Sequence, residues 1–302
     1  MYSTLISVEQ TRALQKAGAA RMIFDCTFAL MQPEAGIAEY RASHIAGAVY
    51  ANLDTDLSAP HGAPGSDGTV LVAPDDGEPS SGGRHPLPSR EKFVSWLSGI
   101  GFRNDMQAVV YDRNGANYCG RLWWMLNWMG HNAVAVLDGG LQAWQAEGGA
   151  VTDHEEPAHF QSNFVASSPR LALVQTAEVA ARLENKSQTL IDARAGARYR
   201  GEVEPIDPIA GHIPGALNRP FSDNLGPDGK FKPAAQLRAE FEALLGGRDP
   251  STVVHHCGSG VSALPNLLAM EIAGLGPTGL YAGSWSEWSN TPGVPTRQGA
   301  AP

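Results

Sequence analysis

The chain has 302 residues, of which 43% are hydrophobic and 18% charged, and this length predicts two globular domains of ordinary size. Its net charge of -9 argues against a surface for nucleic acid or for an anionic membrane, because phosphate binding depends on lysine and arginine. We therefore expect a small-molecule substrate, with no nucleic-acid and no membrane partner.

The amino-terminal segment and the cysteines bear on the compartment. Residues 1–7 have neither a basic region nor an apolar core, and no later stretch reaches the roughly 18 apolar residues that a membrane span needs. This pattern predicts a cytoplasmic protein.

Cys26, Cys119 and Cys257 include no CxxC pair, which argues against a disulfide framework and a structural zinc site. An important cysteine here would therefore be a reactive thiol.

Along the chain, three signatures occur twice in the same order, which divides the sequence into two halves. They are an aspartate that closes an apolar run, a His-Ile-x-Gly-Ala motif and a closing motif that runs from glycine to tryptophan. They lie at 22–25, 44–48 and 139–144 in the first half and at 189–192, 212–216 and 283–288 in the second. The chain is thus predicted to be an internal duplication.

The spacing of the repeats locates an insertion and a linker. The His-Ile-x-Gly-Ala motifs are offset by 168 residues (44 to 212), whereas the closing motifs are offset by 144 (139 to 283). The first half therefore holds about 24 extra residues, for which the Gly/Pro/Ser-rich stretch 57–88 provides a long surface loop. Residues 151–170 are polar and aperiodic and form the predicted linker. We place the domains at 1–150 and 168–302.

The alternation of elements predicts the fold class. In each half, short apolar strands, such as 108–111 and 252–255, alternate with apolar helical patterns, such as 121–126 and 267–272. This order predicts an α/β fold in which each half is a mainly parallel sheet flanked by helices. Ligands of such sheets bind where strand carboxyl ends meet helix amino termini, so the loops after these strands are the candidate sites.

The strongest candidate site is the segment Cys257-Gly258-Ser259-Gly260-Val261-Ser262-Ala263. The cysteine follows an apolar strand and precedes a helix that we expect to open at Ser262 or Ala263, with Pro265 in its first turn. The two glycines can turn several backbone amides toward the sulfur. Such a ring of amides at a helix amino terminus should stabilise a thiolate and a persulfide anion, as a sulfur carrier requires.

Three other interpretations of Cys257 were weighed. A buried, inert thiol is the ordinary interpretation of a single cysteine, but the glycine loop favours function. A cysteine phosphatase needs a longer loop that ends in arginine, and Ala263 stands at that position. A metal site made of His255, His256 and Cys257 is disfavoured because adjacent strand residues point to opposite faces. We expect no metal.

Together these motifs resemble the rhodanese superfamily, and the CGSGVSA loop closely resembles the CGSGV(T/S)A loop of its 3-mercaptopyruvate sulfurtransferases. The resemblance covers essentially the whole chain and includes LDGGL at 137–141 and RLWW at 121–124. It implies two tandem rhodanese-like domains, the first inactive and the second catalytic, with the substrate pocket between them. The repeat alignment agrees, because it places Asp112 and Arg113 opposite His256 and Cys257.

The resemblance implies an enzyme, a 3-mercaptopyruvate or thiosulfate sulfurtransferase. Such enzymes move sulfane sulfur from a small donor through a cysteine persulfide to a thiophilic acceptor such as cyanide, a thiol or a thioredoxin-like protein, without a cofactor. The neutral Gly258-Ser259 pair favours 3-mercaptopyruvate, because thiosulfate-preferring members resemble CRKG and place cations beside a doubly charged donor. The alternatives are a thiosulfate-preferring rhodanese and a non-catalytic rhodanese module that binds a partner or senses oxidants.

The resemblance assigns the donor-binding arginine of the family to Arg198, beside Tyr199. A guanidinium holds a carboxylate or sulfonate with two parallel hydrogen bonds, whereas the alternative for Arg198 is a surface or interdomain ion pair. A second substrate arginine of mercaptopyruvate-type members has no counterpart, because Glu204-Pro205 is followed by Ile206-Asp207.

A Ser-His-Asp arrangement proposed for the family maps onto Ser259, His85 and Asp54, the last two on either side of the long insertion. A proton relay there could protonate a leaving enolate or position the donor. A solvent-exposed loop residue is the alternative interpretation of His85 and of Asp54. The loop residues expected to hold the donor and the transferred sulfur are Gly258, Ser259, Gly260, Val261 and Ser262.

Overall fold

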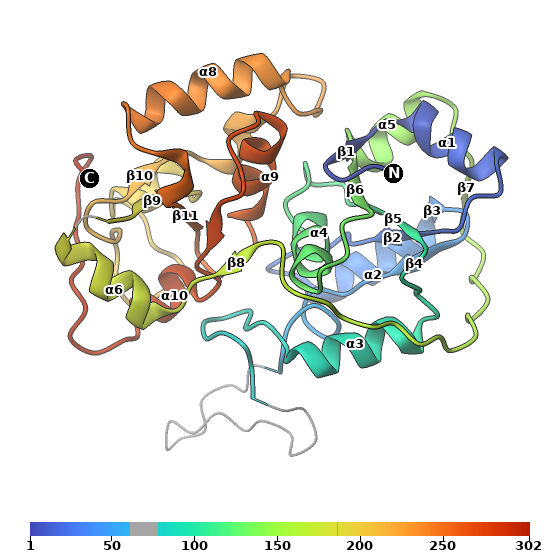
Figure 1. Ribbon diagram of the computed structural model, residues 1–302, viewed down its shortest axis with the longest axis horizontal. Coiled ribbons are helices and arrows are strands. Elements are labelled where there is room, and N and C mark those ends of the chain that lie inside the picture. The colour runs from blue at the N-terminus through green and yellow to red at the C-terminus, as the bar shows by residue number, and fades with distance from the viewer. Residues whose placement is uncertain (61–77, 186) are drawn as a thin grey trace. The chain divides into compact units, whose positions relative to one another are not determined.

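The computed structural model describes residues 1–60, 78–185 and 187–302. Residues 61–77 of the long loop predicted at 57–88 lie outside the described residues. The chain forms two compact units (Figure 1). Unit 1 comprises residues 1–80, 88–170 and 227–230, and unit 2 comprises residues 81–87, 171–226 and 231–302. Residues 81–87, which lie inside the first predicted domain, thus belong to unit 2.

Unit 1 is built on a parallel sheet with the strand order β1-β6-β5-β2-β4. Its strands are β1 (Leu5–Ile6), β2 (Arg21–Asp25), β4 (Ala48–Tyr50), β5 (Gln107–Tyr111) and β6 (Val134–Leu137). The central strands are apolar and buried on both faces, as helices on both sides require. A small antiparallel pair joins β3 (His44–Ile45) to β7 (Val151–Thr152), so the predicted linker begins as a strand.

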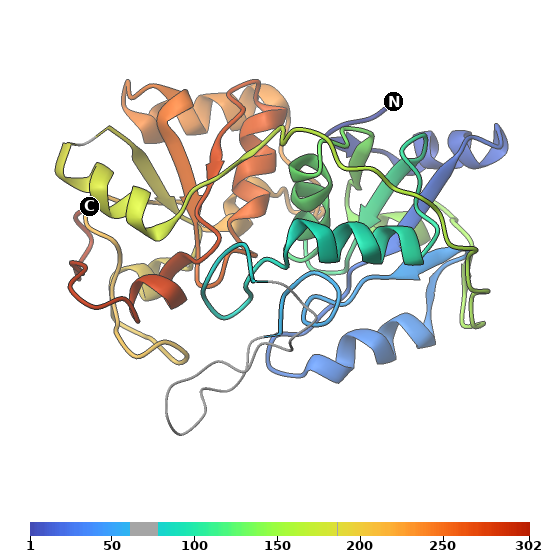
Figure 2. The same cartoon turned by 60° about the horizontal axis from the view of Figure 1, so that its bottom comes forward.

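Helices cover both faces of this sheet (Figures 1 and 2). On one face, α1 (Val8–Lys16) and α5 (Gly140–Ala146) pack Val8 and Trp144 against a core of strand residues. On the other face, α3 (Arg90–Gly99) brings Trp96 to Phe24 of β2, and α4 (Cys119–Trp128) contacts β5 and β6. The remaining helix, α2 (Pro33–Ala42), leads into β3.

Unit 2 repeats this topology. Its parallel sheet has the order β10-β9-β11-β12-β8, which matches the order in unit 1 when each strand is exchanged for its repeat counterpart. The predicted α/β fold with two mainly parallel sheets is confirmed. The strands are β8 (Ala172–Leu173), β9 (Thr189–Asp192), β10 (Leu217–Asn218), β11 (Val253–His256) and β12 (Gly279–Leu280).

The helices of unit 2 also lie on two faces (Figure 1). A cluster on one face joins Val179 of α6 (Thr176–Asn185), Tyr199 of α7 (Gly196–Tyr199) and Trp288 of α10 (Ser284–Trp288) to the sheet. On the other face, α8 (Ala234–Leu245) packs on α9 (Leu264–Ile272). Two short 3-10 helices, η1 (Phe221–Asn224) and η2 (Pro250–Thr252), complete the unit. Within the described ranges, every helix is too short or too polar to cross a bilayer.

The carboxyl ends of β9 and β11 meet at one edge of the unit 2 sheet. His256 pairs in register with Asp192, and the Ala193 amide donates to the His256 carbonyl at 2.9 Å. The loops that lead into α7 and α9 therefore start side by side. Helix α9 begins at Leu264, slightly later than the predicted start at Ser262 or Ala263, and has Pro265 in its first turn.

Candidate active site

The Cys257 loop connects a strand to a helix, as the sequence predicts, but Gly258 and Gly260 play different structural roles in it. Gly260 has a φ of +73°, and a Cβ there would lie 2.2 Å from the Ala282 carbonyl oxygen, so only glycine fits. Gly258 does not have a left-handed conformation. A Cβ at Gly258 would lie 3.3 Å from Arg84 Nη2 and 3.5 Å from Arg198 Nη1. Gly260 therefore turns the loop, and Gly258 admits two guanidinium groups.

Several backbone amides of this loop have no partner. Cys257 is buried, and residues 258–261 are buried beside it. Among the described residues, the amides of Gly258, Ser259, Val261 and Ser262 find no hydrogen-bond acceptor. Buried amides are almost always paired, so such a group is an exception that calls for an explanation. Unpaired amides in the loop that follows a cysteine are suited to bind an anion.

The equivalent loop of unit 1 shows what these amides can do. There the Asp112 carboxylate accepts hydrogen bonds from the amides of Asn114, Ala116, Tyr118 and Cys119 at 2.8–3.1 Å. The repeat alignment places Asp112 opposite His256, one residue before the cysteine. At the repeat offset of 144 residues Asn114 and Tyr118 correspond to Gly258 and Ser262, so an aspartate of the chain itself satisfies in unit 1 two amides whose counterparts in unit 2 have no described acceptor.

The start of α10 holds the Cys257 loop in place. Ser284 is buried and has a φ of +56°, a conformation that is uncommon for residues other than glycine. Its Oγ accepts the Cys257 amide at 3.1 Å and donates to the Tyr281 carbonyl at 3.0 Å. The Trp285 amide donates to the Cys257 carbonyl at 3.0 Å. These bonds position the cysteine from the adjacent strand end.

Two arginines flank the loop through a shared carboxylate. Arg198 of α7 donates from Nη2 to Glu204 at 2.6 Å and to Asp207 at 3.2 Å. Arg84 donates from Nη1 to the other oxygen of Asp207 at 2.7 Å. Arg198 therefore lies beside the cysteine loop, as the resemblance implies. It also forms ion pairs, the role that the sequence offers as the alternative to donor binding. Its role in donor binding stays a prediction.

A third arginine, Arg194, is buried beneath the loop. It donates from Nη2 to Asp192 at 2.7 Å and to the Gly211 carbonyl at 2.6 Å, and its guanidinium lies 4.7 Å from the Trp285 ring. Burial is the largest single influence and lowers the pKa of Arg194, but the carboxylates of Asp192 and Glu204 together outweigh it, so that the pKa is raised. The Cys257 sulfur acts in the same direction. Arg194 therefore contributes a fixed positive charge close to the sulfur.

The predicted serine and histidine come together within unit 2. His85 Nδ1 lies 2.7 Å from Ser259 Oγ, and both side chains are buried. The interpretation of His85 as an exposed loop residue is therefore wrong. Its segment is anchored on α10, because the Arg84 amide donates to Ser286 Oγ at 3.0 Å. Asp54 lies in unit 1 and is partly buried there, and its place in a triad stays a prediction.

The other candidate groups do not form a site. Burial raises the pKa of the Cys26 and Cys119 thiols well above the ordinary range, and nearby aspartates add to the effect. The described part of the chain holds no cluster of three His, Cys, Asp or Glu side chains that could bind a metal ion. Burial also lowers the pKa of His255 to about 3 and that of His256 to about 4, so both rings are neutral at physiological pH.

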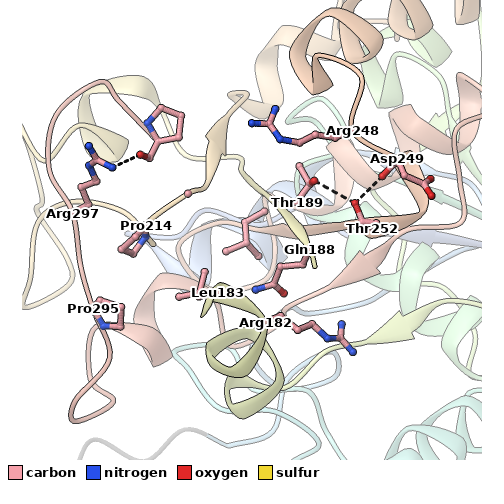
Figure 3. A pocket seen from close by; sticks show the side chains of 13 residues that line it. Arg182, Leu183, Gln188, Thr189, Pro214, Arg248, Asp249, Thr252, Pro295 and Arg297 are labelled. Carbon is pink, nitrogen blue, oxygen red and sulfur yellow. Dashed lines mark hydrogen bonds between the residues drawn. The ribbon is translucent and has the colours of Figure 1, made fainter. Parts of the chain in front are cut away.

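A separate pocket lies at the opposite end of the unit 2 sheet (Figure 3). Thr189 at the start of β9 and Thr252 just before β11 line it, and their hydroxyl groups lie 3.2 Å apart. Because ligands of parallel sheets bind at the carboxyl ends of the strands, this pocket is at the wrong edge for the cysteine chemistry. It also contains none of the predicted site residues.

Comparison with known proteins identifies the family. A model of the rhodanese-like domain matches residues 7–147 and again residues 175–291. The chain belongs to the rhodanese family. Its relatives include a probable 3-mercaptopyruvate sulfurtransferase of Pseudomonas aeruginosa, 42% identical over 99% of this chain and 100% of the relative. They also include a putative thiosulfate sulfurtransferase of Mycobacterium tuberculosis, 35% identical over 98% of each chain.

Solved structures of the rhodanese family agree. The 3-mercaptopyruvate sulfotransferase SseA of Escherichia coli is 28% identical, with a TM-score of 0.75 over 95% of this chain and 100% of that one. A 3-mercaptopyruvate sulfurtransferase of Leishmania major is 29% identical, with a TM-score of 0.74 over 95% of this chain and 74% of that one. The predicted enzyme class, a sulfurtransferase with tandem rhodanese-like domains, is confirmed.

Sequence reasoning missed three residues of this rhodanese site: Arg84, Arg194 and Ser284. Arg84 directly precedes His85 in the sequence, and Arg194 follows the strand-closing Asp192 by two residues. The position of each arginine next to a motif is the only signal that the sequence contains. Ser284 lies within the closing repeat motif at 283–288. Its strained backbone has no sequence signal, because nothing in residue type predicts a left-handed serine.

Proposed function

We propose that this rhodanese takes the thiol sulfur of 3-mercaptopyruvate onto Cys257 as the sulfane sulfur of a persulfide and passes it to an acceptor. The thiolate attacks the donor sulfur, and the carbon–sulfur bond breaks with its electron pair left on carbon as the enolate of pyruvate. Protonation of the enolate gives pyruvate and leaves Cys257 as a persulfide. An acceptor thiolate or cyanide then takes the outer sulfur, and the Cys257 thiolate is restored.

The observation that carries this proposal is the set of unpaired amides around Cys257. A persulfide anion at this position would accept the amides of Gly258, Ser259, Val261 and Ser262. In unit 1 the Asp112 carboxylate accepts the amides of Asn114 and Tyr118, the repeat counterparts of Gly258 and Ser262. Burial holds the thiols of Cys26 and Cys119 neutral.

The proton for the departing enolate is assigned to the Ser259 and His85 pair. Their 2.7 Å contact lets the imidazole and the hydroxyl exchange a proton beside the loop. Asp54 is proposed as the third member, which would orient the histidine as in other Ser-His-Asp arrangements. Arg198 is proposed to hold the carboxylate of the donor, because its guanidinium stands next to Gly258.

The balance of charge supports 3-mercaptopyruvate over thiosulfate. Arg84, Arg194 and Arg198 are matched by three carboxylates, so the surroundings of Gly258 offer a doubly charged anion little net attraction. A relative named as a thiosulfate sulfurtransferase keeps that donor as the alternative. We further propose a cytoplasmic protein with an inactive domain at 1–150 and a catalytic domain at 168–302. Its acceptor would be a small thiol or a thioredoxin-like protein.

The test is sulfur transfer to cyanide, measured as thiocyanate with each donor in turn. We expect Cys257→Ser to abolish transfer, because an alkoxide is a poor sulfur carrier and no other cysteine has a suitable loop. We also expect wild-type protein incubated with donor to gain the mass of one sulfur atom on the peptide that contains Cys257.

The matched control is Cys26→Ser, which removes another buried thiol. This variant should keep its transfer rate once its fold is verified by circular dichroism. Full activity of Cys257→Ser, or a wild-type protein inactive with both donors, would remove the basis of the proposal.

A further inference from the structure

The charged groups beside the Cys257 loop balance one another. Arginines and carboxylates alternate in a continuous network within unit 2, and each arginine has at least one acidic partner. The members are Arg84, Arg194, Arg198, Asp192, Glu204 and Asp207. The network is formally neutral, although the donors of this enzyme class are acids. A neutral site must therefore discriminate among anions by something other than overall attraction.

Asp207 occupies the centre of the exposed part of this network. Its two oxygens are divided between two arginines, with Oδ1 at 2.7 Å from Arg84 and Oδ2 at 3.2 Å from Arg198. The Asp207 side chain is only 3% exposed, whereas those of Arg84 and Arg198 are about a fifth exposed. The carboxylate is thus buried behind the two guanidinium groups, which face outward.

The unused donor groups of the two arginines converge on the loop. Arg84 Nη2 and Arg198 Nη1 donate to no described residue, and both lie within 3.5 Å of the position of a Gly258 Cβ. Arg84 Nε is buried and likewise lacks an acceptor among the described residues. Unpaired guanidinium nitrogens beside a nucleophile are suited to bind an acid group.

We infer that Arg84 and Arg198 together bind the acid group of the donor, and that Asp207 sets the charge of this site so that a singly charged donor is preferred. The inference rests on the proposed function and deepens it. It assigns to Arg84, which comes from the 81–87 segment, the second donor-binding position that the sequence Glu204-Pro205-Ile206-Asp207 leaves without an arginine.

Coulomb repulsion supplies the selectivity. A donor on the outer side of the two arginines lies a few ångströms from the Asp207 carboxylate, and the repulsion scales with the charge of the donor. Thiosulfate carries two negative charges, whereas 3-mercaptopyruvate with a protonated thiol carries one. Asp207 therefore penalises thiosulfate more than 3-mercaptopyruvate.

The decisive experiment measures kcat/KM for both donors in wild-type protein and in Asp207→Asn. We expect the ratio of thiosulfate to 3-mercaptopyruvate to rise about tenfold, mainly through KM, and the rise to shrink at high salt. Asp207→Ser serves as a second variant if asparagine distorts the network. The matched control, Glu202→Gln, removes a charge from a surface pair with Arg200 and should leave the ratio unchanged. An unchanged or lower ratio in both Asp207 variants overturns the inference.

The role of Arg84 has its own test. Arg84→Gln should raise KM for both donors about tenfold, whereas Arg84→Lys should recover part of the loss, because it keeps the charge but not the planar fork. Arg200→Gln is the matched surface control. Equal KM values in Arg84→Gln and wild-type protein would show that Arg84 does not bind the donor.

Binding measurements separate this inference from the proposed function. Calorimetry would compare thiosulfate and pyruvate on the Cys257→Ser protein with and without Asp207→Asn. Tighter binding of thiosulfate relative to pyruvate after the aspartate is removed supports the inference even if the wild-type protein turns over neither donor. Unchanged relative binding contradicts it even if turnover follows the proposed function.

Discussion

At the scale of single residues, the site depends on positions where a side chain is excluded as much as on those where one is present. Gly260 is fixed by its left-handed backbone and by the Ala282 carbonyl, whereas a Cβ at Gly258 would come into contact with the guanidinium groups of Arg84 and Arg198. The sequence predicted both glycines as loop-forming residues. Only the structure shows that the space above Gly258 is the place where the arginines meet the cysteine loop.

Gly258→Ala tests this use of space. The added methyl group would stand 3.3 Å from Arg84 Nη2 and 3.5 Å from Arg198 Nη1, so it would fill the space in which the acid group of the donor is proposed to meet both guanidinium groups. We expect KM for 3-mercaptopyruvate to rise about tenfold, the loss of roughly one charge-assisted hydrogen bond, with a smaller change in kcat. Gly99→Ala is the control, because its Cβ would have no neighbour within 4 Å. A KM equal to that of wild type would contradict the assignment.

At the scale of elements, the strand-to-helix loops of the two units differ in how their inward-directed backbone amides are satisfied. Each follows a buried central strand, β5 or β11, and each directs amides inward before the next helix. In unit 1 the Asp112 carboxylate satisfies four amides, so the loop is closed from within. In unit 2 a histidine replaces that aspartate, and the amides of Gly258 and Ser262, which correspond to two of the four, have no acceptor among the described residues. The two repeats therefore share the strand-to-helix loop but differ in whether a carboxylate of the chain accepts its amides.

Asp112→Asn should destabilise unit 1. An amide group can accept through only one atom, so two of the four backbone amides would lose their acceptor. We expect the free energy of unfolding to fall by about 2–4 kcal/mol, measured by urea unfolding. Asp105→Asn is the matched control, because Asp105 makes an exposed ion pair with Arg103 and should cost much less. Equal effects of both variants would show that the carboxylate does not organise the loop.

At the scale of the whole molecule, two buried histidines should make stability depend on pH. Burial lowers the pKa of His255 to about 3 and that of His256 to about 4, from 6.5 in the unfolded chain. The unfolded state therefore binds more protons between pH 6.5 and 4. Stability is complete above pH 6.5 and falls as the pH drops toward 4, by up to about 1.4 kcal/mol per pH unit for each histidine.

Urea unfolding at pH 7, 6 and 5 measures this slope. In His255→Phe, which keeps an aromatic ring but cannot titrate, the decrease in stability per pH unit should be distinctly smaller than in wild-type protein. A slope that is the same in both proteins would mean that His255 is not held neutral by burial. The comparison uses the change with pH in each protein, so any constant cost of the substitution cancels.

The sequence by itself determined the family, the duplication, the parallel α/β sheets and the cysteine loop, because these depend on local patterns: apolar strands, glycine spacing and repeated motifs. It also indicated His85, Ser259 and Arg198 through resemblance. The tertiary structure decided which of these meet. His85 and Ser259 are 174 residues apart, and their contact depends on how the 81–87 segment packs on α10.

The tertiary structure alone assigned Arg84, Arg194 and Asp207 to the site. Arginine and aspartate are common on protein surfaces, and their residue type does not tell whether a charge faces solvent or another chain segment. Long-range packing brings the three charges into one ion-pair network beside the Cys257 loop. Local patterns could not contain this information, because it arises only when distant segments fold together.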